Sequence, residues 1–293
     1  MNEIITPPTE IVVPKRELIK PGIYYDMQNE DYHATKDISK TTLDLAHDDP
    51  YGPDWSKSCP VDEEKLKTFD FGDAMHAICL EPERLKSEFV VMPKFGQKNV
   101  DKEAKLKWQL AHQGLKILSE DDHKKLNLMF ESVMAHGEAR ELIEAEGVAE
   151  SSYFWIDEQT GLGCKCRPDK HIKNDNLLVD VKTTPYLSKF NFSVDDYRYY
   201  VQDPWYCDGV SRFTDEPVRM EFLVIQKSIE CGRYPVAVLK LPSEAIEYGR
   251  DMYREDLNRY AEYLNSEQPY ETREIDMGYR FNQKIENHFG EVF

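Results

Sequence analysis

A short apolar segment near residue 180 contains two charged residues, and this combination restricts how the chain can fold. Residues 177–183 read Leu-Leu-Val-Asp-Val-Lys-Thr, an apolar run of the kind that forms a buried strand, interrupted by Asp180 and Lys182. Side chains two residues apart project from the same side of a strand, so the carboxylate and the ammonium should lie together. Burying charge in such a strand is costly without partners. We therefore infer a functional site in preference to a surface ion pair.

A further carboxylate, Asp169, lies eleven residues before Asp180, at the end of Arg167-Pro168-Asp169. The polar residues 170–176 could return the chain as a hairpin and bring Asp169 close to Asp180. Two carboxylates and the backbone carbonyl of Val181 would satisfy a hard cation such as Mg²⁺, which acidifies water and polarises a phosphoryl oxygen. Lys182 could orient the attacking water or screen the phosphate. The pattern predicts a catalytic centre of Asp169, Asp180 and Lys182 that cuts a phosphodiester.

Two residues upstream of this centre are candidates to join it. His76 follows small residues that would let a helix approach a sheet closely, and an imidazole ligand would favour Mn²⁺ alongside Mg²⁺. The alternative for a single helical histidine is a structural role. Glu150 is expected to open the strand before Asp169, where it could support the metal ligands. The alternative for Glu150 is an ordinary strand-terminal carboxylate.

A downstream pair, Gln202 and Tyr206, completes the set of candidates. Residues four apart share a helix face, so their polar ends could contact a DNA phosphate or base. The alternative is that the aromatic residues of this helix only pack it on the sheet. Pro204 lies between the two and should kink the helix, which leaves the direction of Gln202 open.

The overall charge constrains the kind of DNA contact. The 293 residues include 37 basic and 55 acidic side chains, a net charge of −18. Such a surface argues against non-specific coating of nucleic acid but allows a local basic groove. The six cysteines are scattered, and we expect Cys164 and Cys166 to be small buried side chains on one face of a strand. Without a signal peptide or a long apolar run, we expect a soluble cytoplasmic protein and no membrane partner.

Hydrophobic periodicity and turn signals predict an α/β fold, in which helices come first and strands follow. We expect an irregular arm over residues 1–31, a single domain over 32–266 with an N-terminal helical elaboration, and a tail over 267–293. The expected helices are 37–49, 69–80, 103–118, 120–146, 194–213 and 243–264; the expected strands are 150–156, 162–167, 177–183, 220–226 and 236–241; residues 51–67 are expected to form a loop.

The motifs of this chain, taken in their order along the sequence, resemble those of the PD-(D/E)xK nuclease superfamily. More narrowly, they resemble the exonuclease domain of RecE (exodeoxyribonuclease VIII) and its phage relatives, which are related to lambda exonuclease. The match runs from about residue 32 to residue 264. A bare Asp-x-Lys would be weak support, whereas the ordered set is specific. It comprises Ile-Ser-Lys-Thr-Thr-Leu (38–43), Gly-Asp-Ala-Met-His (72–76), Glu150 with Tyr-Phe-Trp (153–155), Cys-Lys-Cys-Arg-Pro-Asp (164–169), Asp-Val-Lys-Thr-Thr (180–184) and Gln-Asp-Pro-Trp-Tyr (202–206).

The resemblance implies a central mixed sheet flanked by helices and a Mg²⁺- or Mn²⁺-dependent exonuclease. Such an enzyme degrades one strand of linear duplex DNA from its 5′ end and leaves a 3′ overhang for recombination. The resemblance assigns metal binding to His76, Asp169 and Asp180 and catalysis to Lys182. It assigns contacts with the DNA end to Ser39, Arg167 and Gln202, to which we add Thr183 and Tyr206 of the same motifs. It also implies a homo-oligomeric ring, whose acidic exterior and basic lumen would fit the net charge, and a single-strand annealing protein as a partner.

Three other functions remain open from the sequence. A RecB-like or CRISPR-associated nuclease with an iron–sulfur cluster would need clustered cysteines, which this chain lacks. A non-catalytic nuclease fold could bind DNA ends or a recombination partner, although such a protein would have no need of Asp169, Asp180 and Lys182 together. An acidic protein that mimics DNA is suggested only by the net charge.

Overall fold

A computed structural model describes residues 19–56, 59 and 63–266. The expected tail at 267–293 and most of the expected arm lie outside these residues. The centre of the fold is a five-stranded mixed sheet in the order β10-β9-β8-β7-β4. Its middle strand β8 runs parallel to β9 and antiparallel to β7. The bounds are β4 (Val148–Ala149), β7 (Lys170–Ile172), β8 (Leu177–Thr184), β9 (Arg219–Gln226) and β10 (Val236–Leu239).

Two smaller sheets extend the structure on either side of this centre. One is antiparallel, in the order β1-β5-β6, and the other pairs β2 with β3 in parallel. Ile38, which precedes the first long helix, bridges to Cys164 of β6 and so joins the N-terminal region to the small sheet. The bounds are β1 (Gly22–Tyr24), β2 (Phe89–Met92), β3 (Lys116–Ser119), β5 (Ser152–Ile156) and β6 (Gly163–Cys166).

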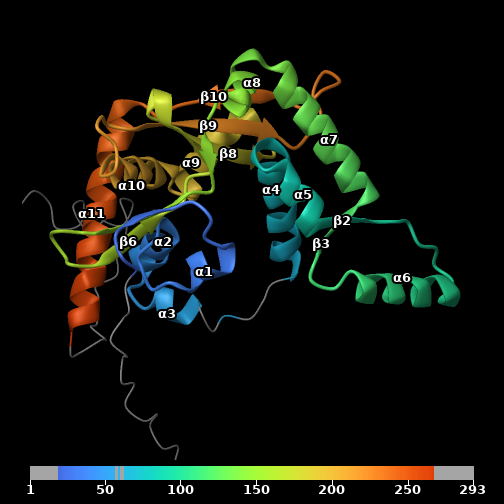
Figure 1. Cartoon of the computed structure of the whole chain (residues 1–293), viewed down its shortest axis with the longest axis horizontal. Helices are drawn as coiled ribbons and strands as arrows, with labels where there is room; N and C mark the ends of the chain where they lie inside the picture. Colours follow the sequence, from blue (N-terminus) through green and yellow to red (C-terminus); the bar gives the residue numbers. More distant parts are fainter. Residues whose placement is uncertain (1–18, 57–58, 60–62, 267–293) are drawn as a thin grey trace, which may run out of the picture.

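Helices cover both faces of the five-stranded sheet (Figure 1). Helices α4, α7 and α8 lie on one side, and α9, α10 and α11 lie on the other with the small antiparallel sheet. The bounds are α1 (Asn29–Ala34), α2 (Lys40–Asp48), α3 (Gly52–Ser56), α4 (Glu63–Leu80), α5 (Pro82–Glu88), α6 (Asn99–Ala111), α7 (Glu120–Ala135), α8 (Gly137–Glu144), α9 (Phe190–Asp196), α10 (Tyr199–Ser211) and α11 (Ser243–Asn265), with 3-10 turns η1 (Lys173–Asp175) and η2 (Leu187–Lys189).

Alternation along β8 divides the core into two clusters. Leu178 belongs to the cluster around Trp205 of α10, whereas Val179 and Val181 belong to the cluster around Met129 of α7. Asp180 and Lys182 have the parity of Leu178, so they project towards α10. The strand that carries charge is therefore buried on both faces, as expected for a central strand.

The mixed α/β fold is confirmed, but several element boundaries differ from the expected ones. The expected loop 51–67 contains α3 and the start of α4. The expected helix 103–118 ends at Ala111, because β3 pairs with β2 from residue 116 onwards. The expected helix 120–146 divides at His136, whose ring Nδ1 accepts a hydrogen bond from the backbone N–H of Ala139 and caps α8. Within the expected irregular arm, residues 22–24 form β1.

Pro204 does not break α10, which continues through it to Ser211. Proline has no N–H to donate to the carbonyl of Tyr200, four residues before it. Gly249 of α11 lies against that carbonyl so closely that a Cβ at Gly249 would be 1.6 Å from the Tyr200 oxygen. The glycine therefore permits the close crossing of α10 and α11.

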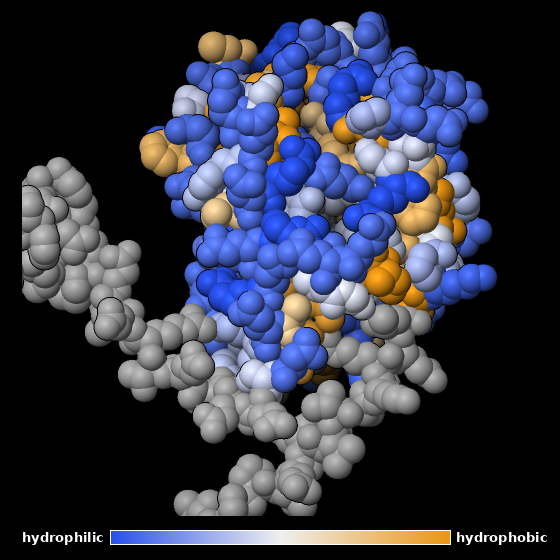
Figure 2. Space-filling model, turned by 90° about the vertical axis from the view of Figure 1, so that its left-hand side faces the viewer, coloured by the Kyte–Doolittle hydropathy of each residue, from blue (hydrophilic) through white to orange (hydrophobic). Residues whose placement is uncertain are grey.

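The surface on the α11 side is mainly hydrophilic, with hydrophobic residues scattered among charged ones (Figure 2). Among the described residues, no helix is both long enough and apolar enough to cross a membrane.

Candidate active site

The β7–β8 hairpin brings Asp169 to the middle of β8, as the sequence predicted. Asp169 immediately precedes β7, and its Oδ2 accepts a hydrogen bond of 2.7 Å from the backbone N–H of Val181. The N–H and C=O of a strand residue point the same way, so the Val181 carbonyl faces the same open edge. The predicted polar connection 170–176 begins with a buried strand, in which Lys170 donates to the carbonyls of Leu142 and Ile143.

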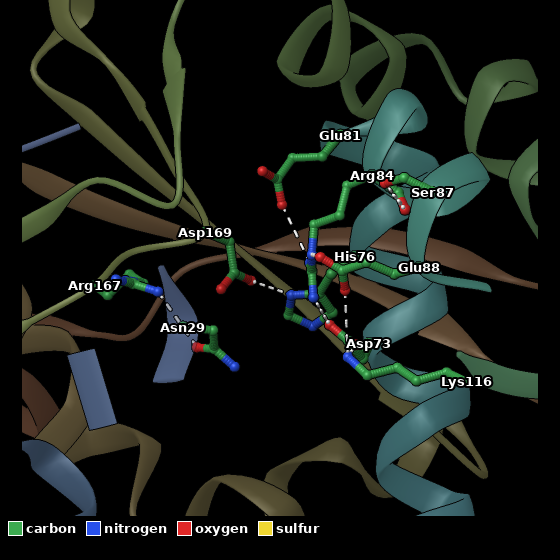
Figure 3. Close-up of polar contacts among 10 residues, drawn as sticks. All are labelled: Asn29, Asp73, His76, Glu81, Arg84, Ser87, Glu88, Lys116, Arg167 and Asp169. Carbon is green, nitrogen blue, oxygen red and sulfur yellow. Dashed lines mark hydrogen bonds and ion pairs between the residues drawn. The ribbon is translucent and has the colours of Figure 1, made fainter. Parts of the chain in front are cut away.

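His76, on α4, points at this carboxylate (Figure 3). Its Nδ1 lies 3.0 Å from Asp169 Oδ2. Burial alone would lower the pKa of His76, but the charge of Asp169 and the hydrogen bond to it outweigh burial and raise the pKa to about 9. The pairing also keeps the pKa of Asp169 below its ordinary value, against the effect of burial.

Glu150 completes a cluster with these two residues. It lies in the bend between β4 and β5 with a φ of 50°, and its N–H donates to the Asp169 carbonyl at 3.1 Å. Ligand atoms of His76, Glu150 and Asp169 all lie within 4.8 Å of one another. Burial and the negative charge of Asp169 raise the pKa of Glu150 to about 8. Two carboxylates and an imidazole at this spacing fit a divalent cation, which would stabilise both carboxylates in their ionised forms.

Asp180 and Lys182 lie beside this cluster and pair with each other. Lys182 Nζ is 2.5 Å from Asp180 Oδ2, and the two side chains are 18% and 2% exposed. Burial alone would lower the pKa of Lys182, but the charge of Asp180 outweighs burial and raises the pKa. The lysine is therefore a cation at neutral pH. Lys182 Nζ also lies 4.7 Å from the centre of the Tyr199 ring. The predicted same-side projection of the two charges is confirmed.

Gln202 is placed differently from the expected DNA contact. It is 5% exposed, and its Nε2 donates a hydrogen bond to Asp180 Oδ1. Its amide donor is thus directed at the carboxylate and positions it.

Arg167 is held on the other side of Asp169. Its Nε donates to Ser152 Oγ at 2.8 Å, its guanidinium also donates to Asn29 Oδ1 and the Met27 carbonyl, and it stacks 4.2 Å from the Tyr32 ring centre. A guanidinium has five N–H donors, so two are not used in bonds to the described residues. Arg167 therefore has a fixed orientation towards the site.

An open cleft of about 1200 Å³ lies between α2, α10 and the start of β7. Glu150, Arg167, Asp169, Asp180 and Lys182 line it, together with Ser39, Gln202 and Tyr206. Ser39 has a structural role as well, because its hydroxyl caps α2 by accepting from the Thr42 N–H at 3.2 Å.

Of the predicted site residues that do not line the cleft, His76 and Val181 contact Asp169, whereas the geometry separates Thr183 from the rest. It does not line the cleft, and alternation along β8 places it on the face opposite Asp180 and Lys182. Its adjacency to Lys182 in sequence suggested a shared site, but adjacent strand residues point apart.

Four cations that line the cleft, Lys36, Lys40, Lys165 and Arg198, have no role in the sequence prediction. Lys40 pairs with Asp44 at 2.6 Å, and Arg198 pairs with Asp44 at 3.2 Å and with the buried Asp256 at 2.5 Å. Lys40 directly follows Ser39 in the Ile-Ser-Lys-Thr-Thr-Leu motif (38–43), and this adjacency could have identified it as a site residue. The sequence around Arg198 gave no such signal, because the position of Arg198 depends on its own left-handed backbone conformation, with a φ of 49°, just before α10.

The cysteines agree with the predicted structural role. Cys164 and Cys166 are buried at 0% and 1% exposure on β6. Among the described residues, the one group of three or more potential metal ligands is His76, Glu150 and Asp169, and it contains no cysteine.

Comparisons with known proteins agree with this architecture. A candidate exonuclease from Eubacterium rectale superposes with a TM-score of 0.60 at 13% identity, over 91% of this chain and 99% of that one. A phage-related exonuclease from Haemophilus somnus 129PT (12% identity, 59% and 90% covered) and an alkaline exonuclease from Laribacter hongkongensis (15% identity, 63% and 96% covered) give TM-scores of 0.29. The fold comparison rests on the first of these. No curated protein matches the sequence.

The family assignment comes from the sequence itself. Residues 54–278 match a family described as a PDDEXK-like domain of unknown function (DUF3799), which covers most of the chain. The predicted membership of the PD-(D/E)xK superfamily is thereby confirmed, and the chain belongs to this PDDEXK-like family.

Proposed function

We propose that the protein is a metal-dependent exodeoxyribonuclease acting on linear double-stranded DNA. The observation that carries the proposal is the convergence of His76, Glu150 and Asp169 within 4.8 Å, at the edge of a cleft that the buried Asp180–Lys182 pair also lines. The nuclease family and the fold support the same class of activity.

Each residue has a distinct task in this reaction. His76, Glu150 and Asp169 would hold Mg²⁺ or Mn²⁺, with Asp180 and the Val181 carbonyl beside them. When bound, such an ion acidifies water and neutralises charge on the phosphate. Lys182, fixed by Asp180 and Tyr199, presents an ammonium that orients water or stabilises the charge that develops on the phosphoryl oxygens. Gln202 holds Asp180 in place for this purpose.

The proposal includes attack from the 5′ end, which leaves a 3′ single-stranded overhang for recombination by strand annealing. This polarity follows the resemblance to the RecE-type exonucleases. The two guanidinium donors of Arg167 that are not used internally could bind a terminal phosphate, with Ser39 and Tyr206 in the same cleft. A homo-oligomeric ring, a single-strand annealing partner and a place in the cytoplasm of a bacterial or phage-infected cell belong to the same proposal.

The test uses linear duplexes labelled at either end, with and without a 5′ phosphate, in the presence of Mg²⁺ or Mn²⁺. We expect early release of the 5′ label and none with Lys182→Ala or Asp180→Ala. Early release of only the 3′ label would contradict the polarity. Absence of any metal-dependent digestion by the unmodified protein would overturn the enzyme assignment and leave a DNA-end-binding scaffold.

A further inference from the structure

The region around α6 has the opposite charge to the rest of the chain. Residues 94–116 contain six lysines, one aspartate and one glutamate, whereas the whole chain has 37 basic and 55 acidic residues. Helix α6 projects from the body of the protein and buries none of its side chains (Figure 1). Because α6 contributes no buried side chain to the core, its function is to be sought in the surface that it forms with the neighbouring elements.

One face of α6 turns back towards the body and closes a groove. Lys102, Lys105 and Gln109 recur at three- and four-residue intervals and so share a helix face. They line two adjoining hollows of about 600 and 790 Å³, which both include Lys105 and Ser119. We call this the α6 groove. Its lysines are Lys94, Lys102, Lys105, Lys116, Lys125 and Lys227, and its carboxylates are Glu120 and Asp122.

Most of this positive charge is not neutralised within the described part of the chain. Lys94 pairs with Asp121 at 3.0 Å, and Lys116 pairs with Asp73 and, at 3.5 Å, with Glu88. Lys102, Lys105, Lys125 and Lys227 have no ion pair with a described residue. Burial and the nearby ammonium of Lys125 lower the pKa of Lys227. Like charges held together in this way favour an anion bound between them.

The groove borders α4, which carries His76, and β8, which carries Lys182. Lys116 bonds Asp73, one helical turn before His76 on α4, and Figure 3 draws Lys116, Asp73 and His76 side by side. At the other side, the Lys227 N–H donates to the carbonyl of Thr184, the last residue of β8, at 2.7 Å. A polymer that leaves the cleft past α4 and the end of β8 would therefore enter the groove.

We propose that the α6 groove binds the phosphate backbone of duplex DNA beyond the end that is cut, as a site separate from the cleft. This inference rests on the proposed function, since it assumes that the substrate is a long duplex. Each lysine ammonium is a compact charge that can pair with a single phosphate. Lysines spaced along a helix face can therefore contact successive phosphates of one DNA strand. The exposed apolar side chains Val100, Leu106 and Leu110 of α6 do not line the groove, so they do not argue for a protein in it.

The experiment measures binding without cleavage. Fluorescence anisotropy of labelled duplexes of about 40 and about 10 base pairs is recorded in EDTA over a series of salt concentrations. The variant is Lys105→Gln/Lys125→Gln/Lys227→Gln, which keeps polar stems of similar size. The control is Lys86→Gln, an exposed lysine of α5 outside the groove. Circular dichroism and thermal unfolding show whether both variants fold.

We expect the triple variant to bind the long duplex about 10-fold or more weakly and to flatten the slope of log K against log salt by about 2 to 3, since each phosphate contact contributes about 0.9. The short duplex and the control should be unaffected. Unchanged affinity and slope for the long duplex would overturn the proposal. So would a change in sedimentation with unchanged DNA binding, because the groove would then contact a second copy of the chain.

The two proposals fail in different ways. Salt-dependent binding that the variant loses, with no digestion by the unmodified protein in Mg²⁺ or Mn²⁺, supports the groove and contradicts the exonuclease. Normal digestion of long duplexes by both the unmodified protein and the triple variant, with equal affinities, contradicts the groove alone.

Discussion

The side-chain amide of Gln202 donates a hydrogen bond to Asp180 Oδ1, across 22 residues of sequence and between α10 and β8. The other carboxylate oxygen, Oδ2, faces Lys182 Nζ at 2.5 Å. The carboxylate is therefore held from two sides, and removing either partner should move it.

Gln202→Leu tests whether this amide positions Asp180 or contacts DNA. If it positions the carboxylate, kcat should fall by about 10- to 100-fold, the range for residues that orient a metal-site ligand, while KM for DNA changes little. Steady-state kinetics on a linear duplex separates the two parameters. A rise in KM with unchanged kcat would favour the DNA contact instead.

Lys182→Gln should abolish most of the activity and leave the fold intact. Loss of one preorganised group that stabilises transition-state charge typically lowers kcat by about 100- to 1000-fold. The rate of nucleotide release is the measurement, with Lys189→Gln in η2 as a matched control. Activity within a few-fold of the unmodified protein would exclude Lys182 from the chemistry.

His76→Ala removes one of the three clustered donors and should weaken metal binding. We expect the Mn²⁺ concentration that gives half-maximal activity to rise by about 10-fold or more, because loss of a residue that only orients a metal ligand already costs about 10- to 100-fold. Isothermal titration of the metal-free protein with Mn²⁺ provides a readout that does not need activity. Unchanged Mn²⁺ affinity would place the ion away from this cluster.

The stability of the metal-free protein should fall as the pH rises. The folded-state pKa of Glu150 is raised to about 8, so its stabilising contribution is full below its unfolded pKa of 4.5 and is lost as the pH passes about 8. His76, with a pKa raised to about 9 from 6.5, acts in the same direction at somewhat higher pH. The thermal midpoint of the protein in EDTA should thus decrease between pH 6 and pH 9, and less so in Glu150→Gln. Added Mn²⁺ should offset the decrease, since it binds the ionised carboxylates. A midpoint in EDTA that does not depend on pH would contradict the assignment.

Gly249→Ala should destabilise the crossing of α10 and α11. A Cβ there would be 1.6 Å from the Tyr200 oxygen, so the helices must separate, at a cost of about 1–3 kcal/mol in the free energy of unfolding. Gly72→Ala is the matched helical control, because no atom lies within 4 Å of its added Cβ, and it should stabilise by up to about 1 kcal/mol. Urea unfolding measures both. Equal effects would show that the close approach is not rigid.

The centre of the site could be predicted from sequence because its determinants are local. Asp180 and Lys182 share a strand, and Asp169 reaches them through one tight hairpin, so alternation and spacing sufficed. Glu150 was harder: it was read as the first residue of a strand, but a left-handed bend turns it towards Asp169. Gln202 was predicted as a DNA contact of open direction, because nothing local indicates a partner 22 residues away.

The missed elements have the same physical explanation. Strand β3 pairs with β2 in parallel, 27 residues earlier in sequence, so the pairing leaves no local pattern. Lys170 and His171 made β7 look like a polar loop, yet Lys170 is satisfied by helix-end carbonyls and His171 Nδ1 lies 2.7 Å from the Tyr153 hydroxyl. Polar residues that find partners only in the folded state cannot be distinguished from exposed ones by pattern.

The hydrogen bond from the Val181 N–H to Asp169 has a consequence for observing the site. This amide lies in the central strand but is held by a side chain, because β7 begins only at Lys170, which pairs with Val179. The exchange of this amide with solvent deuterium therefore reports the position of the Asp169 carboxylate and not the transient opening of backbone hydrogen bonds in the sheet. The backbone amide resonance of Val181 can therefore report the position of the Asp169 carboxylate even in an inactive variant of the protein.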